Sequence, residues 1–556
     1  MILIEEKKSS KLPNLTSLYF KLDFINNEIE DSLKQQAISY YDEKTNTREL
    51  PINRLFYLIN LLSKYDDVKF IPYKKPTKKL KKVTNNFKVK PFSYQLEGIE
   101  YGLNHDGWLL LDDQGLGKTL QMIYLAEALK KDEGLEHCFI ICGINSLKYN
   151  WIDEIEKFSK LSYTILGQTK TKSGKIKISS VKDRCKQLKQ GIKEFFVITN
   201  LETLQHKDFA KAFKSSKSKF GMIVLDEAHK AKSPDSKSAK TLLKLKSPRN
   251  IALTGTLIMN DPENAYVSLK WTGNLNCTFG QFKSMYNIYG GFGGVQVIGH
   301  KNLDLLKEHI EACSLRRLKN DVLDLPEKTY KKEYVELNPK QREFYNEVAK
   351  GVAEELDLLS KRQKITLMQE MVMNMRLRQV TSYPGMLTTE DIPSSKLDRL
   401  EELVEEIVAQ GDKVVVFTTF KGAAIEVEKR LSKYSPLVCT GDQTDTEIGA
   451  NKRCFQNSDD NKVLIATWQK MGTGVTLTKA SYIIFIDTPW TDAEFQQCSD
   501  RIYRIGQVKN VCIITLIAKD TYDERVQEIL ERKEVLSDYI IDGIESDSLL
   551  QIEDYI

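Results

Sequence analysis

The chain has 556 residues, of which 41% are hydrophobic and 29% are charged, with a net charge of +5 at neutral pH. This length is too great for one hydrophobic core, so two to four domains are expected, and the composition is that of a soluble globular protein. No apolar run approaches the roughly 18 residues of a membrane span, the N-terminus lacks a signal peptide's apolar stretch, and the small charge permits nucleic acid as a partner without requiring it.

The use of cysteine and arginine gives two further indications. The nine cysteines are scattered without a C-x-x-C pair, which predicts a reduced protein without a zinc site. The expected compartment is the cytoplasm, including a host's cytoplasm for a viral protein, and the nucleus only for a eukaryotic one. Lysine outnumbers arginine 65 to 17, as codon bias in an AT-rich genome would produce. The few arginines therefore mark positions that need a planar, permanently charged fork.

The first part of the chain reads as a small α+β module over residues 1–67, with a strand at "LTSLYFKLDF" and a helix at "INRLFYLINLLSKY". Residues 68–90 follow with nine lysines and no acid, and are interpreted as a solvated linker or as one that also contacts phosphates.

From residue 91 onward, short apolar runs alternate with amphipathic helical segments, which predicts an α/β fold with parallel strands buried on both faces. One series of runs ends with "FGMIVLDEAH" and "NIALTGT", and a second begins at "DKVVVFTTF". The expected organisation is a first lobe over 91–335, a second over 336–535, each with a helical protrusion, and a tail over 536–556. Residues 157–193 hold eleven Lys or Arg and one acid, Asp183. This segment is interpreted either as a solvated surface loop or as part of a nucleic-acid track.

A phosphate-binding turn is predicted at "LLLDDQGLGKTLQ", which follows a strand and opens a helix. Backbone N–H groups in such a turn point at a phosphate, and the helix dipole adds to the attraction. Lys118 would reach the β and γ phosphates of ATP, and Thr119 would bind Mg²⁺. The strict pattern wants Gly at position 112, where this chain has Asp, so a Gly-rich strand–helix turn without a ligand is the alternative.

The strand "FGMIVLDEAH" supplies the complementary carboxylates. Asp226 is predicted to bind the metal and Glu227 to position the attacking water, which is most of what phosphoryl transfer requires. His229 is spaced to couple the ATP site to another ligand, and "LTGT", with Thr254, Gly255 and Thr256, is predicted to be a coupling element at the end of the next strand.

Three further segments are expected to contact the nucleotide. Gln95, before the phosphate loop, is predicted to hydrogen-bond the adenine edge. In the second lobe, "ATWQKMGTGVTL" has glycines that allow close backbone approach. In "QQCSDRIYRIGQ", Arg501 and Arg504 are spaced to share one face of a helix and would reach the γ-phosphate when the lobes close.

The order and spacing of these motifs resemble the Swi/Snf-type ATPases of helicase superfamily two. The phosphate loop of that family reads D-E-x-G-L-G-K-T, close to the segment from Asp112 to Thr119 here, which accounts for the missing glycine. The segments "SLRRLKNDVLDLPEKTYKKEYVEL", "MRLRQVTSYPGML", "SSKLDRLEELVEEI" and "DRIYRIGQ" also match. The resemblance covers residues 91–535 approximately. It implies two RecA-like lobes, ATP and Mg²⁺ as cofactors, and ATP-driven movement along duplex DNA.

By motif position, the resemblance assigns functional residues across both lobes. The expected ATP contacts are Gln95, Asp113, Gly115, Leu116, Gly117, Lys118, Thr119, Gly474 and Gln497. The expected phosphate contacts to DNA are Asn150, Thr199, Thr418, Thr419, Thr467 and Thr473. Hydroxyls and backbone amides at helix N-termini suit phosphates rather than bases.

Departures from the family pattern narrow the expected role. Leu257 replaces the proline of L-T-G-T-P, "DEAH" stands where many chromatin remodellers have D-E-G-H, and no histone-reading module is visible. These features favour a compact, annealing-helicase-like or phage or bacterial branch, acting as a monomer on duplex or forked DNA. The alternatives are a strand-separating DNA or RNA helicase, the motor subunit of a defence or nuclease complex, and a scaffold with an inactive ATP site.

Overall fold

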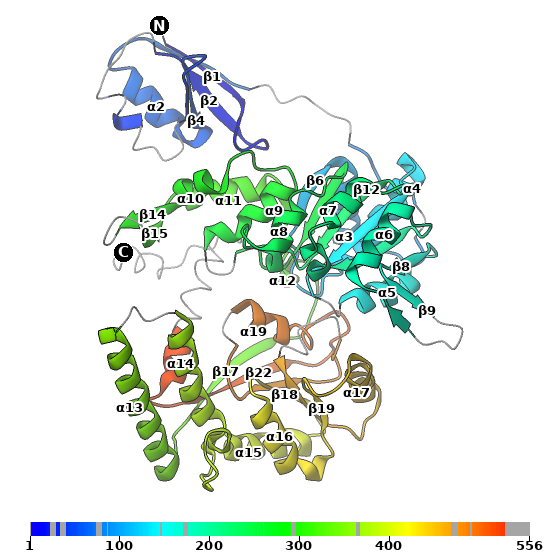
Figure 1. Ribbon diagram of the computed structural model, residues 1–556, viewed down its shortest axis with the longest axis vertical. Coiled ribbons are helices and arrows are strands. Elements are labelled where there is room, and N and C mark those ends of the chain that lie inside the picture. The colour runs from blue at the N-terminus through cyan, green and yellow to red at the C-terminus, as the bar shows by residue number, and fades with distance from the viewer. Residues whose placement is uncertain are drawn as a thin grey trace. The chain divides into compact units, whose positions relative to one another are not determined.

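The structure, a computed structural model, describes residues 2–22, 29, 31–33, 40–73, 80–85, 87–144, 147–170, 176–258, 261–290, 296–362, 367–468, 476–489 and 492–528. Two compact units divide the chain, one beginning at Met1 and continuing to Lys319, the other covering Asn320–Glu534. In Figure 1 the colour runs along the chain from the N-terminal module through the first lobe to the second.

The N-terminal module is a five-stranded sheet in the order β3-β4-β2-β1-β5, on which α2 packs. Its elements are β1 (Ile2–Lys8), β2 (Thr16–Phe20), β3 (Tyr40–Asp42), β4 (Thr47–Pro51), α2 (Leu55–Leu62) and β5 (Val68–Ile71). Leu58 and Leu62 of α2 are buried against Ile4 and Leu18 of the sheet. Because β5 pairs in parallel with β1, the module extends beyond residue 67, where its end was predicted.

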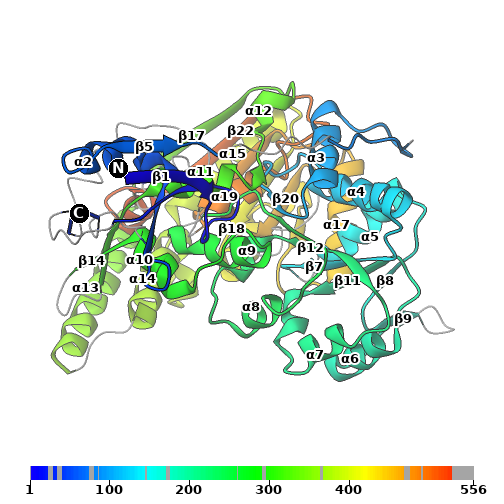
Figure 2. The same ribbon diagram turned by 90° about the horizontal axis from the view of Figure 1, so that it is seen from above.

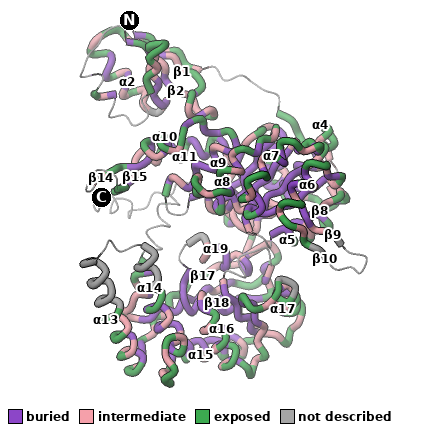
Figure 3. The backbone as a smooth tube through the Cα atoms, viewed as in Figure 1, coloured by how far each residue is buried: buried purple, intermediate pink, exposed green. Residues whose placement is uncertain are grey.

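The first lobe contains a seven-stranded sheet, ordered β16-β6-β13-β12-β7-β11-β8, whose ladders are all parallel. Its strands are β6 (Gly107–Leu110), β7 (His137–Cys142), β8 (Tyr163–Ile165), β11 (Phe196–Asn200), β12 (Phe220–Asp226), β13 (Arg249–Leu253) and β16 (Ser314–Leu315). Most residues of these strands are buried, and the exceptions lie mainly in the edge strands β8 and β16. In Figure 3 much of the tube in this lobe is purple. Two faces covered by helices explain the near-continuous apolar runs in the sequence.

Helices cover both faces of this sheet (Figure 2). One face packs against α3 (Ser93–Asn104), α4 (Lys118–Glu133) and α5 (Leu147–Phe158). The other packs against α6 (Val181–Gln190), α7 (Phe209–Lys214), α8 (Lys237–Leu242) and α9 (Tyr266–Trp271). The lobe also contains α10 (Phe279–Tyr286), α11 (Leu303–Glu311) and two hairpins, β9 (Gln168–Lys170) with β10 (Ile176–Ile178) and β14 (Asn287–Gly290) with β15 (Gln296–His300). The short helix α12 (Lys319–Val322) lies where the chain passes from one unit to the other.

The second unit is built on a six-stranded parallel sheet in the order β17-β22-β21-β18-β20-β19. Its strands are β17 (Lys328–Val335), β18 (Val414–Thr418), β19 (Leu437–Cys439), β20 (Val463–Thr467), β21 (Tyr482–Phe485) and β22 (Val511–Ala518). Its helices are α13 (Pro339–Arg362), α14 (Leu367–Ser382), α15 (Ser395–Ala409), α16 (Lys421–Arg430), α17 (Asp445–Asn457) and α19 (Asp492–Ser499). Helices α15 and α16 pack on one face, and α17 and α19 on the other.

These sheets confirm the predicted α/β class with two parallel-sheet lobes and a small N-terminal α+β module. The predicted lobe boundary at residue 335 is wrong, because β17 pairs along its whole length with β22 and so belongs to the second sheet. Strand β16 has only two residues, and β17, although eight residues long, is a largely exposed edge strand rich in lysine and tyrosine, so neither leaves the apolar run that predicts a buried strand. No helix among the described residues is long and apolar enough to cross a membrane. The tail over 536–556 lies outside the described residues.

Candidate nucleotide site and motor elements

The predicted phosphate loop joins β6 to α4, and its backbone requires glycine. Gly115 and Gly117 have φ angles of 88° and 76°, a region that L side chains rarely adopt. A Cβ on Gly117 would lie 2.5 Å from Nε2 of Gln95. Helix α4 begins at Lys118 without a side-chain cap, so its first N–H groups are positioned to receive an anion.

Lys118 is the first residue of α4, and its side chain folds back onto the start of this loop. Its Nζ donates to the backbone oxygen of Asp112 at 2.7 Å and to that of Asp113 at 3.2 Å. Burial lowers the pKa of the ammonium, while the carboxylates of Glu227 and Asp112 act in the opposite direction. The Lys118 ammonium is removed from water and donates to two backbone carbonyls, so a phosphate oxygen would be a stronger acceptor for it.

Asp226 and Glu227 follow one another at the carboxyl end of β12. Asp226 is buried, accepts a hydrogen bond from Nε1 of Trp151 at 2.9 Å, and has its pKa raised to about 6, first by burial and then by Glu227. Glu227 holds a φ of 51°, an uncommon conformation for a residue that is not glycine. The carboxylate of Asp226 and the hydroxyl of Thr119 are oxygen donors of the kind that suit Mg²⁺.

The DEAH motif and the LTGT segment are joined through one histidine. The buried ring of His229 has its Nδ1 3.0 Å from Oγ1 of Thr254 and 3.3 Å from Oε2 of Glu227. Burial lowers the pKa of His229 to about 3, so the ring is neutral at pH 7. The hydroxyl of Thr254 donates to the carbonyl of Thr256 at 2.9 Å. The two segments predicted to couple ATP to another ligand are therefore in direct contact.

Two arginines that sequence reasoning left without a role hold the phosphate loop. Arg317 forms a bidentate pair with the fully buried Asp112, with Nε to Oδ1 at 2.9 Å and Nη2 to Oδ2 at 2.6 Å. Arg316 donates from Nη1 to the carbonyls of Leu111 at 2.8 Å and Gly255 at 3.2 Å. The sequence did offer a signal for their importance. Arginine is scarce in this chain, and Arg316 and Arg317 are adjacent within the family-like segment "SLRRLKNDV".

Gln95 lies against the same loop. Its Oε1 accepts from the backbone N–H of Phe92 at 3.0 Å, and its Nε2 donates to the carbonyl of Leu116 at 3.1 Å. Asp113 accepts the backbone N–H of Lys319 at 3.0 Å. Both predicted residues therefore border the phosphate loop, and their contacts to nucleotide stay predictions.

The threonines predicted to contact DNA fall into two groups. Thr199 and Thr418 are buried at 1% and 0% exposure, so their hydroxyls are not the surface donors that were expected. Thr418 donates instead to Oδ2 of the buried Asp487 at 2.6 Å. Thr419, whose backbone N–H donates to Oδ1 of Asp487 at 2.7 Å, is half-buried.

The remaining predicted positions differ in surroundings. Asn150 is half-buried on α5, and Thr467 is buried at the end of β20. Arg378, in a quoted family segment, forms an ion pair with Asp487 at 3.8 Å. Asp487 thus organises the carboxyl edge of the second sheet, a role that only the packing of α14 reveals.

The arginine pair of the second unit is not on a helix. Helix α19 ends at Ser499, and the chain continues in turns through Arg501, which is buried, and Arg504, which is half-buried. The expectation of one shared helix face is wrong, because the helix stops before both residues. Gln497 is buried in the last turn of α19. Thr473 and Gly474 lie outside the described residues.

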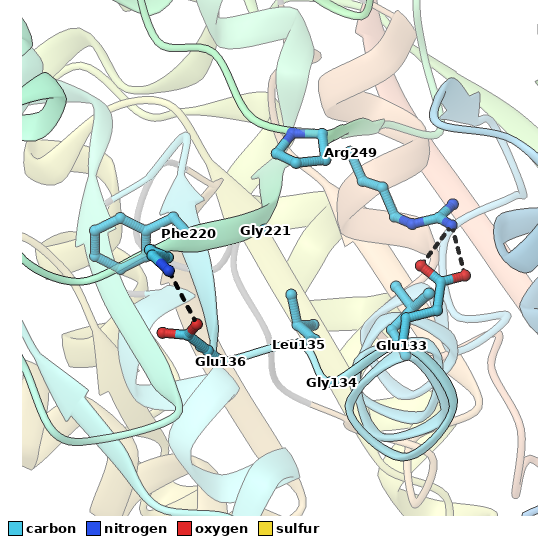
Figure 4. A pocket seen from close by; sticks show the side chains of 10 residues that line it. Glu133, Gly134, Leu135, Glu136, Phe220, Gly221 and Arg249 are labelled. Atoms are coloured by element: carbon cyan, nitrogen blue, oxygen red, sulfur yellow. Dashed lines mark hydrogen bonds and ion pairs between the residues drawn. The ribbon is translucent and has the colours of Figure 1, made fainter.

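A separate cavity of about 330 Å³ opens at the opposite, amino-terminal edge of the first sheet (Figure 4). It is lined by the end of α4 and the starts of β12 and β13, including Glu133, Phe220 and Arg249. Arg249 donates from Nη2 to both carboxylate oxygens of Glu133, at 3.0 and 3.1 Å. This ion pair between the buried Arg249 and the exposed Glu133 joins α4 to β13, and the cavity contains none of the residues predicted to bind ATP.

Comparison with known proteins gives two family matches and several relatives. The SNF2-related domain matches residues 34–386, and the helicase conserved C-terminal domain matches residues 395–506. An uncharacterized ATP-dependent helicase of Mycoplasma pneumoniae is 27% identical, over 89% of this chain and 47% of its own length. The putative ATP-dependent helicase/translocase YwqA of Bacillus subtilis is 28% identical, over 83% and 50%. The mouse DNA annealing helicase and endonuclease ZRANB3 is 27% identical, over 83% and 41%. The chain spans about half the length of the curated relatives it matches.

Proposed function

This chain belongs to the family of proteins with an SNF2-related domain, and on that premise we propose that it is an ATP-driven translocase on duplex DNA. The observation that carries the proposal is the joined set at the carboxyl edge of the first sheet. Lys118, Asp226 and Glu227 lie at the ends of β6 and β12, and His229 connects them to Thr254 at the end of β13, the strand between. The proposal agrees with the names of two relatives, a putative helicase/translocase of Bacillus subtilis and a mouse DNA annealing helicase.

In this proposal ATP binds at the N-terminus of α4. The backbone N–H groups from Gly115 to Thr119 and the ammonium of Lys118 hold its phosphates, while Thr119 and Asp226 hold Mg²⁺, which supplies charge neutralisation. Glu227 orients the attacking water. Arg501 and Arg504 of the second unit stabilise charge on the γ-phosphate, so that hydrolysis depends on domain closure.

In this proposal the contacts of His229 carry a structural change from the ATP site to the LTGT segment, which couples hydrolysis to movement on DNA. Because the hydroxyl proton of Thr254 goes to the carbonyl of Thr256, the neutral His229 ring donates from Nδ1 to Thr254, and it also faces Glu227, so a change at the water-positioning carboxylate acts on the LTGT segment through this ring. DNA contacts come from half-buried positions such as Asn150 and Thr419, through phosphates rather than bases.

The test measures ATP hydrolysis with fork, duplex, single-stranded DNA and RNA. We expect the strongest stimulation with DNA that contains duplex. Lys118→Ala should abolish hydrolysis, and the exposed Lys130→Ala on the same helix serves as the matched control. Normal turnover in the Lys118 variant would refute the site, and stimulation by RNA alone would refute the substrate. Strand displacement from a fork would favour the strand-separating alternative.

A further inference from the structure

The cations of the first lobe are concentrated in one stretch of chain. Residues 157–249 contain 23 Lys or Arg and seven Asp or Glu, leaving 59 Lys or Arg and 70 Asp or Glu in the rest of the chain. Codon bias explains why these cations are lysines, but it does not explain why acids are missing beside them. The separation of charge within one lobe is therefore a property of its surface.

The structure gathers many of these lysines on adjacent helices. Helices α6, α7 and α8 pack against one another and onto the same face of the sheet, through Leu188, Phe213 and Leu242 among others (Figures 1 and 2). Their outer surfaces carry exposed lysines, here called the lysine face: Lys182, Lys186, Lys189, Lys211, Lys214 and Lys240. Lys182, Lys186 and Lys189 have helical spacing and form one exposed stripe on α6, next to the stripe with the buried Cys185 and Leu188.

The charges of the lysine face are poorly compensated. Lys186 pairs with Asp183 at 3.5 Å and Lys240 with Asp235 at 3.3 Å, both at exposed sites. Among the described residues, Lys189, Lys211 and Lys214 form no ion pair within 4 Å. A surface of this kind attracts a polyanion whose charges are as closely spaced as the lysines.

We propose that the lysine face binds the phosphate backbone of duplex DNA, outside the track lined by the motif residues. The inference rests on the proposed function. A duplex is favoured over a single strand because binding of unpaired bases uses exposed aromatic rings. Within the described residues 181–249, no large hydrophobic side chain is exposed. The face covers one side of the sheet, whereas Lys118, Asp226 and Thr254 lie at the carboxyl ends of its strands. It therefore adds affinity and length of contact rather than chemistry.

The test compares the full chain with a triple variant, Lys189→Glu, Lys211→Glu and Lys214→Glu. The matched control reverses three exposed lysines of the second unit, Lys340→Glu, Lys429→Glu and Lys479→Glu, with the same change in net charge. Dissociation constants are measured for short and long duplexes and for phosphatidylserine vesicles over a range of salt. Thermal unfolding and ATP hydrolysis at saturating DNA are measured beside them.

We expect the triple variant to bind long duplex about tenfold or more weakly, with a salt dependence less steep by about three units, because each phosphate contact contributes about 0.9. Turnover at saturating DNA should equal that of the wild type. Equal affinity of the two triple variants for duplex DNA would overturn the inference. A loss of affinity for phosphatidylserine vesicles alone would also overturn it and would assign the lysine face to membranes. If the wild type is neither bound nor stimulated by duplex, the proposed function fails instead.

Discussion

At the scale of single residues, the nucleotide site depends on side chains that hold the phosphate loop in place without being predicted to contact ATP themselves. Asp112 stands where a stricter phosphate loop has glycine, and it is buried with its charge met by Arg317 and by Nε2 of Gln121 at 2.9 Å. Asp112 therefore ties the segment after β6 to the segment that follows β16, where Arg317 lies. The ammonium of Lys118, which is predicted to bind phosphate, donates to the backbone carbonyls of Asp112 and Asp113. Arg317 therefore positions Lys118 indirectly, by holding the backbone at Asp112.

Arg317→Ala should destabilise the fold strongly, because it leaves the Asp112 carboxylate buried without its partner. Removing one member of a buried pair costs about 3–5 kcal/mol. Arg317→Lys should recover part of this loss, because it restores a positive charge beside Asp112. Recovery should be incomplete, because an ammonium cannot donate to both carboxylate oxygens in the geometry of a guanidinium. Urea unfolding measures both, and Lys421→Ala, which breaks an exposed pair with Asp442, is the control that should change little. Equal stability of the alanine variant and the wild type would contradict this account.

At the scale of elements, one buried histidine fixes a helix to the edge of the first lobe. His309 of α11 lies with its Nε2 2.7 Å from the carbonyl of Asn274, and burial lowers its pKa to about 4. Asn274 in turn donates to the hydroxyl of Thr272 at 2.8 Å and to the carbonyl of Gly107, at the start of β6, at 3.2 Å. The neutral ring thus joins α11 to the sheet.

This histidine should make the lobe sensitive to acid. Because the folded pKa lies below the ordinary value near 6.5, the unfolded chain binds the proton first, and stability is lost as pH falls from 6.5 toward 4. By pH 5 the loss from this residue is about 2 kcal/mol. In His309→Gln the fall in unfolding free energy between pH 7 and pH 5 should be smaller by that amount, as measured in urea. The same pH dependence in both proteins would show that folding does not lower the pKa of this ring.

At the scale of the whole molecule, the proposed chemistry is divided between two units. Lys118, Asp226 and Glu227 belong to the first, whereas Arg501 and Arg504 belong to the second, in turns that follow α19. Such a division allows ATP to bind before the reaction can proceed, and makes turnover depend on movement.

Arg504→Ala tests this division. We expect turnover to fall by about 10³-fold or more with little loss of nucleotide affinity, because an arginine finger acts on charge that develops in the transition state. Nucleotide titration and steady-state hydrolysis are measured on the same preparation. Parallel losses of affinity and turnover would assign Arg504 to ground-state binding.

The sequence by itself determined the α/β class, the two sheets and the positions of Lys118, Asp226, Glu227 and Thr254, because buried parallel strands and phosphate loops leave local patterns of apolar runs and glycine spacing. Only the tertiary structure decided that β17 joins the second sheet and that Thr199 and Thr418 are buried. It alone brought together Arg317 with Asp112, His229 with Thr254, and Thr418 with Asp487. Each of these depends on which distant segments pack together, and a strand's neighbours are set by the pairing of whole sheets rather than by its own residues. The lysine face has the same origin: the surplus of lysine is written in the chain, but its gathering on three helices follows from their shared packing on one side of the sheet.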